Sequence, residues 1–325
     1  MNSGITLLTV GPSRTILPGM RITDPSDPLA MILSLLRPQT FLSKIVSGAG
    51  KWSIRKPRSE DPAFYLILNG SCFLDPDGVG PLELRVGDFV LLPAMPGFTL
   101  ASDLNITPTP VPLDNARETH YGPKSGPATM RMLGGYFLFD RANAQLLVKL
   151  LPPVIHIRRE EAGATRLRRI VELIGEETDT HRPGRVLILE RLVEVLLVEA
   201  LRFRSSSAAR EDQGLLAGLS DASLAQTLRE IHVDVARHWT VEQLARTAGM
   251  SRAVFAERFM RKIGMPPMQY LLEWRMALAK NILRNERPSL AEVADRVGYQ
   301  SASAFSTAFT RLSGKSPSQF ARSAD

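Results

Sequence analysis

Cysteine and histidine, the side chains most often used for thiol chemistry and for binding transition metals, are scarce in this sequence of 325 residues. It contains one cysteine, Cys72, and five histidines, which are His120, His156, His181, His232 and His238. A single thiol can form neither a disulfide within the chain nor a multi-cysteine zinc site, so we interpret Cys72 as a small buried hydrophobic residue. The histidines do not combine into a ligand pattern, and we interpret each as a surface or core-edge residue. The sequence therefore predicts no metal site, no cofactor and no catalytic residue.

Chemistry of another kind, the recognition of a nucleic acid, is indicated by a motif that occurs twice in the last hundred residues. Each copy opens with a capping box, a hydroxyl residue followed three positions later by Gln or Glu: Thr240 with Gln243, and Ser289 with Glu292. Equivalent residues lie 49 positions apart up to a glycine and 50 apart beyond it. The further pairs are Gly249 and Gly298, Ser251 and Ser301, Phe255 and Phe305, Phe259 and Phe309, Gly264 and Gly314, Pro267 and Pro317, and Tyr270 and Phe320.

Each copy predicts a short capped helix, a glycine turn and a second helix whose phenylalanines face a core. This is the helix-turn-helix arrangement, in which the second helix enters the major groove of DNA. Between the copies, residues 266–285 predict one helix. Eighteen helical residues span about 27 Å, enough to hold the two recognition helices about one DNA turn apart. The alternative is a helical bundle that contacts other proteins.

The face of each recognition helix opposite its phenylalanines follows from the helical period of about 100° per residue. The expected base-facing residues are Arg252, Ala253, Ala256 and Glu257 in the first unit, and Ala302, Ser303, Ser306 and Thr307 in the second. The expected phosphate-binding residues are Arg258, Lys262, Arg311 and Lys315.

Glu257 is the most discriminating of these side chains, because a carboxylate accepts a hydrogen bond from the amino group of cytosine. The alternative is an ion pair with Arg261 at i+4. The second unit carries only short side chains, and we expect it to contribute more to positioning on the DNA backbone than to base reading.

The charge distribution favours a polyanionic partner for the C-terminal part. Residues 225–325 hold 15 Lys and Arg against 9 Asp and Glu, whereas residues 21–115 hold 8 against 10. A basic segment joined to a near-neutral one predicts that the first contacts nucleic acid and the second has another role. Charge alone is also compatible with solvated helices.

The N-terminal part has a different pattern, and the whole chain predicts an α+β protein of two domains. Residues 1–23 are interpreted as a tail, and residues 27–38 predict a short helix with Asp27 as its N-cap. Residues 40–102 consist of short apolar runs between Gly, Pro and Asp turns, which predicts an antiparallel sandwich or barrel. Residues 105–127 are interpreted as a loop or excursion, residues 130–139 as a strand pair, and residues 206–220 as a linker.

The interior of the barrel is expected to be apolar. The residues expected to face inward are Phe64, Leu66, Leu68, Phe73, Phe89, Leu91 and Phe98. Such an interior would suit a small, mostly apolar organic effector, or it could be filled by its own side chains. The two possibilities remain open at this point.

Two long helices are predicted at residues 160–178 and 185–204, and the second is too apolar for one face to bury. Its apolar residues are Val186, Leu189, Val193, Leu196, Leu197, Ala200 and Leu201. We expect this helix to contribute to a homodimer, with Val193 facing outward. A central helix within one domain is the alternative.

With these motifs the sequence resembles the AraC/XylS family of bacterial transcription regulators. The C-terminal matches are residues 239–245, 248–251, 258–259, 264–270, 274–276, 293–299, 305, 309 and 314–317. Looser N-terminal matches are residues 27–29, 35–38, 68–72 and 87–93, which resemble the cupin-type sensor domain of one branch of that family.

The resemblance implies a cupin-like effector-sensing and dimerisation domain at residues 24–205 and a DNA-binding domain with two helix-turn-helix motifs at residues 221–325. It implies a regulator of promoters, with double-stranded DNA and RNA polymerase as partners, and not an enzyme. The alternatives are a constitutive DNA-binding dimer, a DNA-alkylation repair protein, and a cupin-type enzyme with a helical domain. The repair protein would need reactive or zinc-bound cysteines, and the enzyme would need histidine ligands that residues 40–103 lack.

Membrane insertion and export are not indicated by the sequence. The most apolar stretch, residues 186–201, is interrupted by four charged side chains, and a spanning helix needs about 20 predominantly apolar residues. The N-terminus shows no basic segment followed by a long apolar run. We therefore expect the protein in the cytoplasm.

Overall fold

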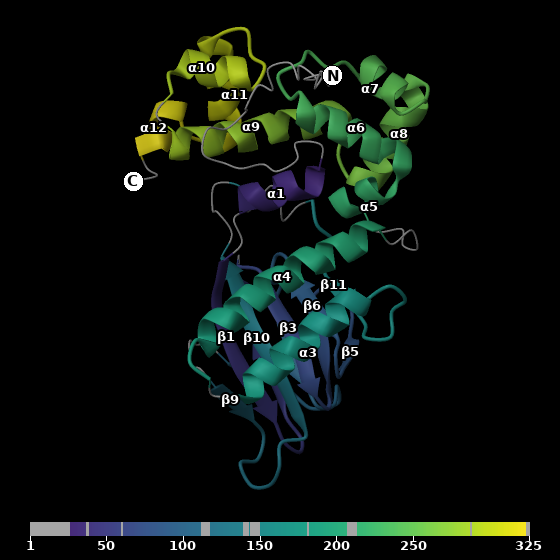
Figure 1. Ribbon diagram of the computed structural model, residues 1–325, viewed down its shortest axis with the longest axis vertical. Coiled ribbons are helices and arrows are strands. Elements are labelled where there is room, and N and C mark those ends of the chain that lie inside the picture. Colours follow the sequence, from purple (N-terminus) through teal and green to yellow (C-terminus); the bar gives the residue numbers. More distant parts are fainter. Residues whose placement is uncertain are drawn as a thin grey trace, which may run out of the picture.

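In the computed structural model the chain forms two lobes, one built from β-sheets with two covering helices and one built from helices alone (Figure 1). The structure describes residues 27–36, 39–59, 61–111, 118–138, 143, 150–180, 182–206, 213–286 and 288–322. The expected tail at 1–23 and residues 207–212 of the expected linker lie outside this description. We call residues 39–206 the β-rich lobe and residues 213–322 the helical lobe.

Helix α1 (Pro28–Leu36) lies between the two lobes and contacts helices of both (Figure 1). The carboxylate of Asp27 accepts hydrogen bonds from the amides of Leu29 and Ala30 at 3.0 and 3.1 Å. These bonds satisfy amides that a helix leaves free at its first turn. The predicted short helix and its N-cap are confirmed.

Two sheets form the β-rich lobe. One has the strand order β11-β6-β3-β10-β1-β9 and the other the order β5-β4-β7-β2-β8. The bounds are β1 Gln39–Gly48, β2 Ser53–Lys56, β3 Ala63–Asn69, β4 Ser71–Pro76, β5 Leu82–Arg85, β6 Phe89–Leu92, β7 Phe98–Ala101, β8 Thr109–Pro110, β9 Glu118–Tyr121, β10 Met130–Leu138 and β11 Ile155–Ile157.

One expectation about these strands was wrong, and another was incomplete. Residues 130–139 were expected to form a strand pair, but β10 is one strand that pairs with both β1 and β3. Gly134 does not turn the chain; it leaves room for the Tyr65 ring, which would lie 3.1 Å from an added Cβ. The excursion at 105–127 is not only a loop, because it supplies the edge strands β8 and β9.

The prediction of the barrel interior was wrong for most residues. Phe64, Leu66, Phe89 and Leu91 belong to the hydrophobic cluster that includes the covering helices, with Leu68 packed against it. Phe73 is half-buried and lies outside the cluster between the sheets, and only Phe98 of the expected set is in that cluster. The residues that face inward from the same strands are Tyr65, Ile67, Cys72, Leu74, Val90 and Leu92. Strands β3 and β6 are buried on both faces, so their apolar runs carry no alternation that tells the faces apart.

Helices α3 (Thr165–Asp179) and α4 (Arg185–Ser206) pack on each other and cover the six-stranded sheet (Figure 1). Val193 was expected to face outward, but it is fully buried in the core under α4. The exposed apolar side chains of α4 are instead those of Val186, Leu187, Ile188 and Val195. Helix α4 is apolar around most of its circumference, so its sequence does not indicate which face is buried. The prediction failed for this reason.

The helical lobe contains both predicted helix-turn-helix units. Its helices are α5 Leu215–Ser220, α6 Ala222–Val233, α7 Val241–Thr247, α8 Arg252–Ile263, α9 Pro267–Asn285, α10 Leu290–Arg296, α11 Ala302–Ser313 and α12 Pro317–Arg322. Both capping boxes form, at Thr240 with Gln243 and at Ser289 with Glu292. The predicted helix between the units is α9, which buries eleven of its residues.

His232 lies in the centre of the helical lobe and not at the edge of a core. Its ring is fully buried and stacks on Trp274, with centroids 4.1 Å apart. Its Nε2 lies 2.7 Å from the hydroxyl of Tyr270. Burial disfavours the charged imidazolium and lowers the pKa of His232 to about 3.

This depressed pKa predicts that acid destabilises the fold. Between the ordinary pKa of 6.5 and the folded value of about 3, the unfolded state binds a proton that the folded state does not. Stability therefore falls as the pH drops below 6.5, and His232 contributes a loss of about 2 kcal/mol between pH 7 and pH 5. Urea unfolding at the two pH values, followed by tryptophan fluorescence, measures this loss. His232→Phe should lack this component and His238→Phe, at an exposed position, should retain it; equal pH dependence in both variants would contradict the assignment.

Candidate nucleic-acid interface

The two recognition helices have the same length because the same residue types cap them. The hydroxyl of Ser251 accepts a hydrogen bond from the amide of Val254, and that of Ser301 from the amide of Ala304. Each helix spans 12 residues and ends at a glycine in the left-handed conformation, with φ of 89° and 72°. These local signals define where α8 and α11 begin and end.

The phenylalanine pairs direct one face of each recognition helix into the core. Phe255 and Phe259 in α8, and Phe305 and Phe309 in α11, are fully buried. The expected base-facing residues then divide into two groups. The exposed ones are Arg252, Ala253, Glu257, Ser303 and Thr307, and the half-buried ones are Ala256, Ala302 and Ser306.

Two exposed residues of this face were missed by the sequence reasoning. Val254 is 53% exposed, and Ala304, at the same position of α11, is exposed as well. The face predicted from the sequence takes the core direction from the first phenylalanine of each helix alone. Including Phe259 and Ile263, which are also buried, turns the direction by about 40° and brings Val254 onto the outward face.

Glu257 is the acidic side chain at the centre of the outward face of α8. Its side chain is 77% exposed, and Oε1 lies 3.8 Å from Nη1 of Arg261. An exposed ion pair at this distance is worth about 0–1 kcal/mol. Breaking the pair with Arg261 so that Glu257 can contact a DNA base therefore costs little free energy. Arg252 is held more closely, with Nε 3.0 Å from Oε1 of Glu242 in the preceding helix.

The residues expected to bind phosphates do not share one environment. Arg258 turns inward, and its Nε and Nη2 both lie 2.7 Å from Oδ2 of Asp221. The side chain of Asp221 is 5% exposed and also caps α6. Removing Arg258 would leave that carboxylate buried without its cation, so we assign Arg258 to the structure and not to phosphate. Lys262 is half-buried, whereas Arg311 and Lys315 are exposed.

One side chain of the helix between the two units contacts both sides of their junction. Arg275 of α9 donates hydrogen bonds to the carbonyls of Val235 and Arg237, at 3.0 and 2.8 Å. The same guanidinium lies over the ring of Tyr299 in the second unit, 5.9 Å from its centroid. Gly298 has a φ of +79° and packs so closely on the 235–237 loop that an added Cβ would collide with a carbonyl there. The turn of the second unit is thus packed on the loop that precedes the first.

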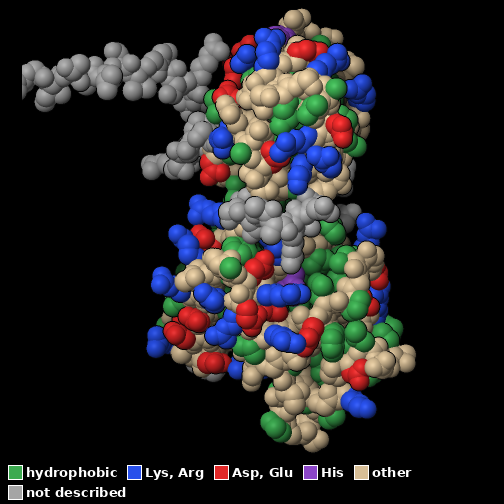
Figure 2. All heavy atoms as spheres, turned by 90° about the vertical axis from the view of Figure 1, so that its right-hand side faces the viewer, with side chains coloured by type: hydrophobic (Ala, Val, Ile, Leu, Met, Phe, Trp, Pro, Cys, Tyr) green, Lys and Arg blue, Asp and Glu red, His purple; other side chains and the backbone are tan. Residues whose placement is uncertain are grey.

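Lys and Arg side chains stand at the surface of the helical lobe on the side where α7 and α8 lie, with Asp and Glu side chains among them (Figure 2). The Lys and Arg side chains of this face can contact phosphates without reading sequence.

The remaining candidates for chemistry are not arranged for it. Cys72 is buried, as expected, and burial raises the pKa of its thiol to about 12, so it is not a thiolate nucleophile at neutral pH. Within the described ranges no three His, Cys, Asp or Glu side chains gather as a metal site. None of the described helices has both the length and the apolar character needed to cross a bilayer.

Known proteins resemble this chain along most of its length. Residues 27–203 match the model of a family described as cupin, and residues 244–323 match one described as a helix-turn-helix domain. The chain is 36% identical over 297 residues to a putative AraC-like transcription regulator of Streptomyces lividans, covering 90% of this chain and 97% of that protein. A protein of the same description from Streptomyces antibioticus is 35% identical, with 90% and 98% covered.

Among solved structures, the DNA-binding domain of the global transcriptional factor AdpA in complex with a target DNA is similar to part of this chain. It is 32% identical and covers 30% of this chain and 89% of its own, with a TM-score of 0.30.

The exposure of Glu257 predicts a role in base discrimination. Glu257→Gln should change the preferred base at one position of the first half-site, because a good base contact contributes about 1–3 kcal/mol of discrimination. Sequencing of duplexes selected from a random pool by the full-length protein measures the preference. Glu230→Gln removes the same charge from an exposed position on α6 and serves as the control. An unchanged profile for Glu257→Gln would show that Glu257 only pairs with Arg261.

Proposed function

The chain belongs to the AraC family of transcription regulators, and we propose that its two units read successive major grooves of one duplex, while the β-rich lobe joins two copies. It is a sequence-specific DNA-binding transcription regulator. The observation that carries the proposal is the duplication itself: two recognition helices with the same caps, length and outward positions are attached to one helix, α9. A single protein contact surface would not require the same helix twice.

The dimensions of α9 support this mode of binding. It has 19 residues, which gives a length of about 28 Å, close to the ~34 Å of one DNA turn. The hydrogen bonds of Arg275 to the 235–237 loop oppose rotation of one unit against the other. Fixed units favour two half-sites at one defined spacing.

We assign different roles to the two recognition helices. In α8, Arg252, Ala253 and Glu257 would contact base edges, with Val254 beside them, and Ala256 would line the groove wall. The outward side chains of α11 are short and would fit closely into the groove; they are Ala302, Ser303, Ser306 and Thr307. The hydroxyl of Thr307 already donates to the carbonyl of Ser303 at 3.0 Å, so it is not free to donate to a base. Lys262, Arg311 and Lys315 would contact phosphates.

Family membership extends the proposal to RNA polymerase as a partner at regulated promoters, and to the cytoplasm as the place where the protein meets DNA. We propose no catalytic role. The relatives are named as transcription regulators, and the buried, protonated thiol of Cys72 argues against cysteine-based DNA repair.

We propose that the protein responds to a small organic effector, but not one held between the two sheets. Sixteen buried side chains, including Trp52, Tyr65 and Phe98, occupy the space there. This packing favours the filled-barrel alternative. An effector would need a site elsewhere in the molecule, or the protein would be a constitutive DNA-binding dimer.

A homodimer is supported by the outward sides of α3 and α4. Leu173, Val186, Leu187, Ile188 and Val195 are between 43% and 65% exposed. Exposed apolar residues that gather on neighbouring helices often mark protein interfaces. A two-fold axis would place the same helices of two copies against each other.

Gel shifts with selected duplexes test DNA binding directly. The full-length protein should prefer two half-sites about 10 bp apart in direct orientation, with affinity falling about tenfold or more between 50 and 200 mM salt. Lys315→Ala should weaken binding to all sequences alike, whereas Lys51→Ala, at an exposed position of the β-rich lobe, should not. Binding that is insensitive to salt, or indifferent to an added half-turn between the half-sites, would refute this mode.

The dimer is tested by a charge on the exposed face of α4. Leu187→Asp should convert the dimer to a monomer in light scattering at micromolar concentration, because a carboxylate would be buried in the interface. Leu104→Asp, at a 44% exposed apolar residue outside α3 and α4, should leave the mass unchanged. A wild-type protein that is monomeric under these conditions would contradict the proposed homodimer.

A further inference from the structure

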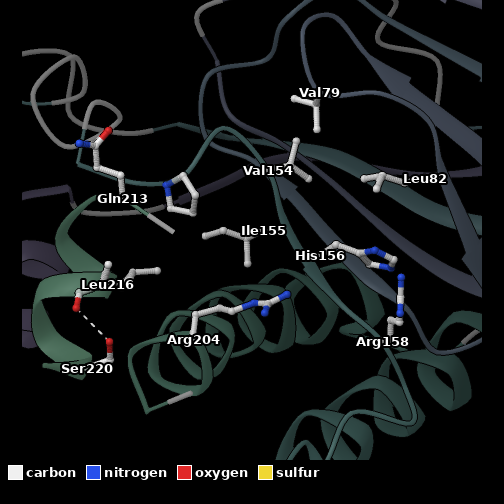
Figure 3. Close-up of a pocket in the computed structure, with 12 residues that line it drawn as sticks. Val79, Leu82, Val154, Ile155, His156, Arg158, Arg204, Gln213, Leu216 and Ser220 are labelled. Atoms are coloured by element: carbon white, nitrogen blue, oxygen red, sulfur yellow. Dashed lines mark hydrogen bonds between the residues drawn. The ribbon is translucent and has the colours of Figure 1, made fainter. Parts of the chain in front are cut away.

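A pocket of about 210 Å³ lies between the β-rich lobe and α5 (Figure 3). Its apolar wall combines Val79 and Leu82 of the β4–β5 hairpin, Val154 and Ile155 around the start of β11, and Leu216 of α5. The volume is below the ~300–1,000 Å³ of sites for drug-sized ligands, so the pocket suits a small molecule. Both lobes contribute walls, so a molecule that fills the pocket contacts both.

The charged side chains that line this pocket are all basic. They are Arg158 and Arg204, with His156 beside them, and no acidic residue is among the lining residues. The Arg204 side chain is 8% exposed and extends toward His156 (Figure 3), while its Nη1 lies 3.3 Å from Oε1 of Glu161. The His156 ring is held by Asp88, with Nε2 and Oδ2 3.1 Å apart.

The charge of Asp88 is secured by its own hydrogen bonds. Burial opposes its ionisation, but the hydrogen bonds from His156 and from the amides of Arg159 and Arg85 prevail, and its pKa lies below the ordinary value. The carboxylate therefore stays negative and orients the imidazole at the pocket wall. The basic end of the pocket is a built arrangement and not a chance gathering of surface side chains.

This combination of walls selects a class of ligand. Guanidinium groups bind carboxylates through paired, charge-assisted hydrogen bonds, and the apolar wall favours a hydrocarbon body beside that charge. Arg204 already has a carboxylate partner in Glu161 at the long distance of 3.3 Å. A ligand carboxylate would add to that contact or replace it.

Helix α5, one wall of the pocket, packs directly on the first recognition helix. Gly218 of α5 has no side chain, and an added Cβ would collide with Ile263 of α8. At the end of α5, Asp221 forms the ion pair with Arg258 of α8. A displacement of α5 must therefore move α8 or break these contacts.

The segment that leads into α5 connects the pocket to the end of α8 by hydrogen bonds. Gln213 lines the pocket, and its Nε2 donates to the carbonyl of Met260 at 3.3 Å. The amide of Gly214 donates to the carbonyl of Lys262 at 2.8 Å, and the next amide donates to the carbonyl of Leu150 in the β-rich lobe at 2.6 Å. Three consecutive residues thus touch the pocket, the recognition helix and the β-rich lobe.

We propose that this pocket binds a small organic anion, a carboxylate with a short apolar body, and that its occupancy changes the position of α8 through α5. The effect on α8 rests on the proposed function, because it is measured as a change in DNA affinity. Binding of the carboxylate to the pocket does not depend on the proposed function. A ligand that touches both lobes binds best in one arrangement of them and so favours that arrangement. The linkage is reciprocal, so DNA changes the affinity for the carboxylate by the same factor.

Calorimetric titration of the full-length protein tests the site with benzoate, phenylacetate and hexanoate as probes and their uncharged amides as matched controls. At least one carboxylate should bind with a Kd of about 1 mM or lower, and about tenfold more tightly than its amide. Arg204→Gln should weaken it about tenfold. Arg202→Gln changes an exposed arginine of the same helix that pairs with Glu199 and should leave the Kd unchanged.

A second variant keeps the test independent of the buried Arg204. Val79 is 41% exposed on a hairpin, so Val79→Trp should fold, narrow the pocket and weaken the carboxylate. Binding of none of the three carboxylates overturns the proposal, as does equal binding of acid and amide. Unchanged affinity in both Arg204→Gln and Val79→Trp overturns it as well.

The coupling is measured by the DNA affinity with and without a saturating carboxylate. A change of about fivefold or more is expected, and Val79→Trp should abolish it. A carboxylate that binds but leaves DNA affinity unchanged overturns the coupling. DNA binding without carboxylate is a separate measurement. A protein that does not bind DNA in that measurement would contradict the proposed function but not the binding of carboxylate in the pocket.

Discussion

The buried side of α1 is covered by both lobes at once. Met31 and Leu35 belong to the same hydrophobic cluster as Leu197 of α4 and Trp274 of α9. Each buried side chain of this size is worth about 1.5–3 kcal/mol, so separating the lobes would expose apolar surface at a large cost. The recognition helices are therefore joined to the β-rich lobe through a common core as well as through the chain between them.

The repeated units are alike in their caps and cores but differ in how they are anchored. Arg258 joins α8 to the capping residue of α6, and the equivalent position of α11 is Ala308. The first unit thus packs on α5 and α6 and lies beside the inter-lobe pocket. The second unit is held through α9 and Arg275. This asymmetry agrees with our proposal that the first unit reads bases and responds to the β-rich lobe, whereas the second positions the protein on DNA.

The packing of the β-rich lobe also decides where a ligand can enter. The six-stranded sheet is buried on one face by α3 and α4 and on the other by the second sheet, and both faces are filled with side chains. The pocket lies instead where the β4–β5 hairpin, β11 and α5 meet.

The sequence by itself determined the features whose signals are local. Hydroxyl caps, left-handed glycines and phenylalanines four positions apart act within one or two helical turns, and the helices they predict are those of the helical lobe. Only the tertiary structure decided which way ambiguous elements face. The apolar runs of β3, β6 and α4 are buried on more than one side, so neither Phe64 nor Val193 could be oriented from its neighbours in sequence. Arg258 turns inward because of a carboxylate 37 positions away, and no pattern along one helix carries that information.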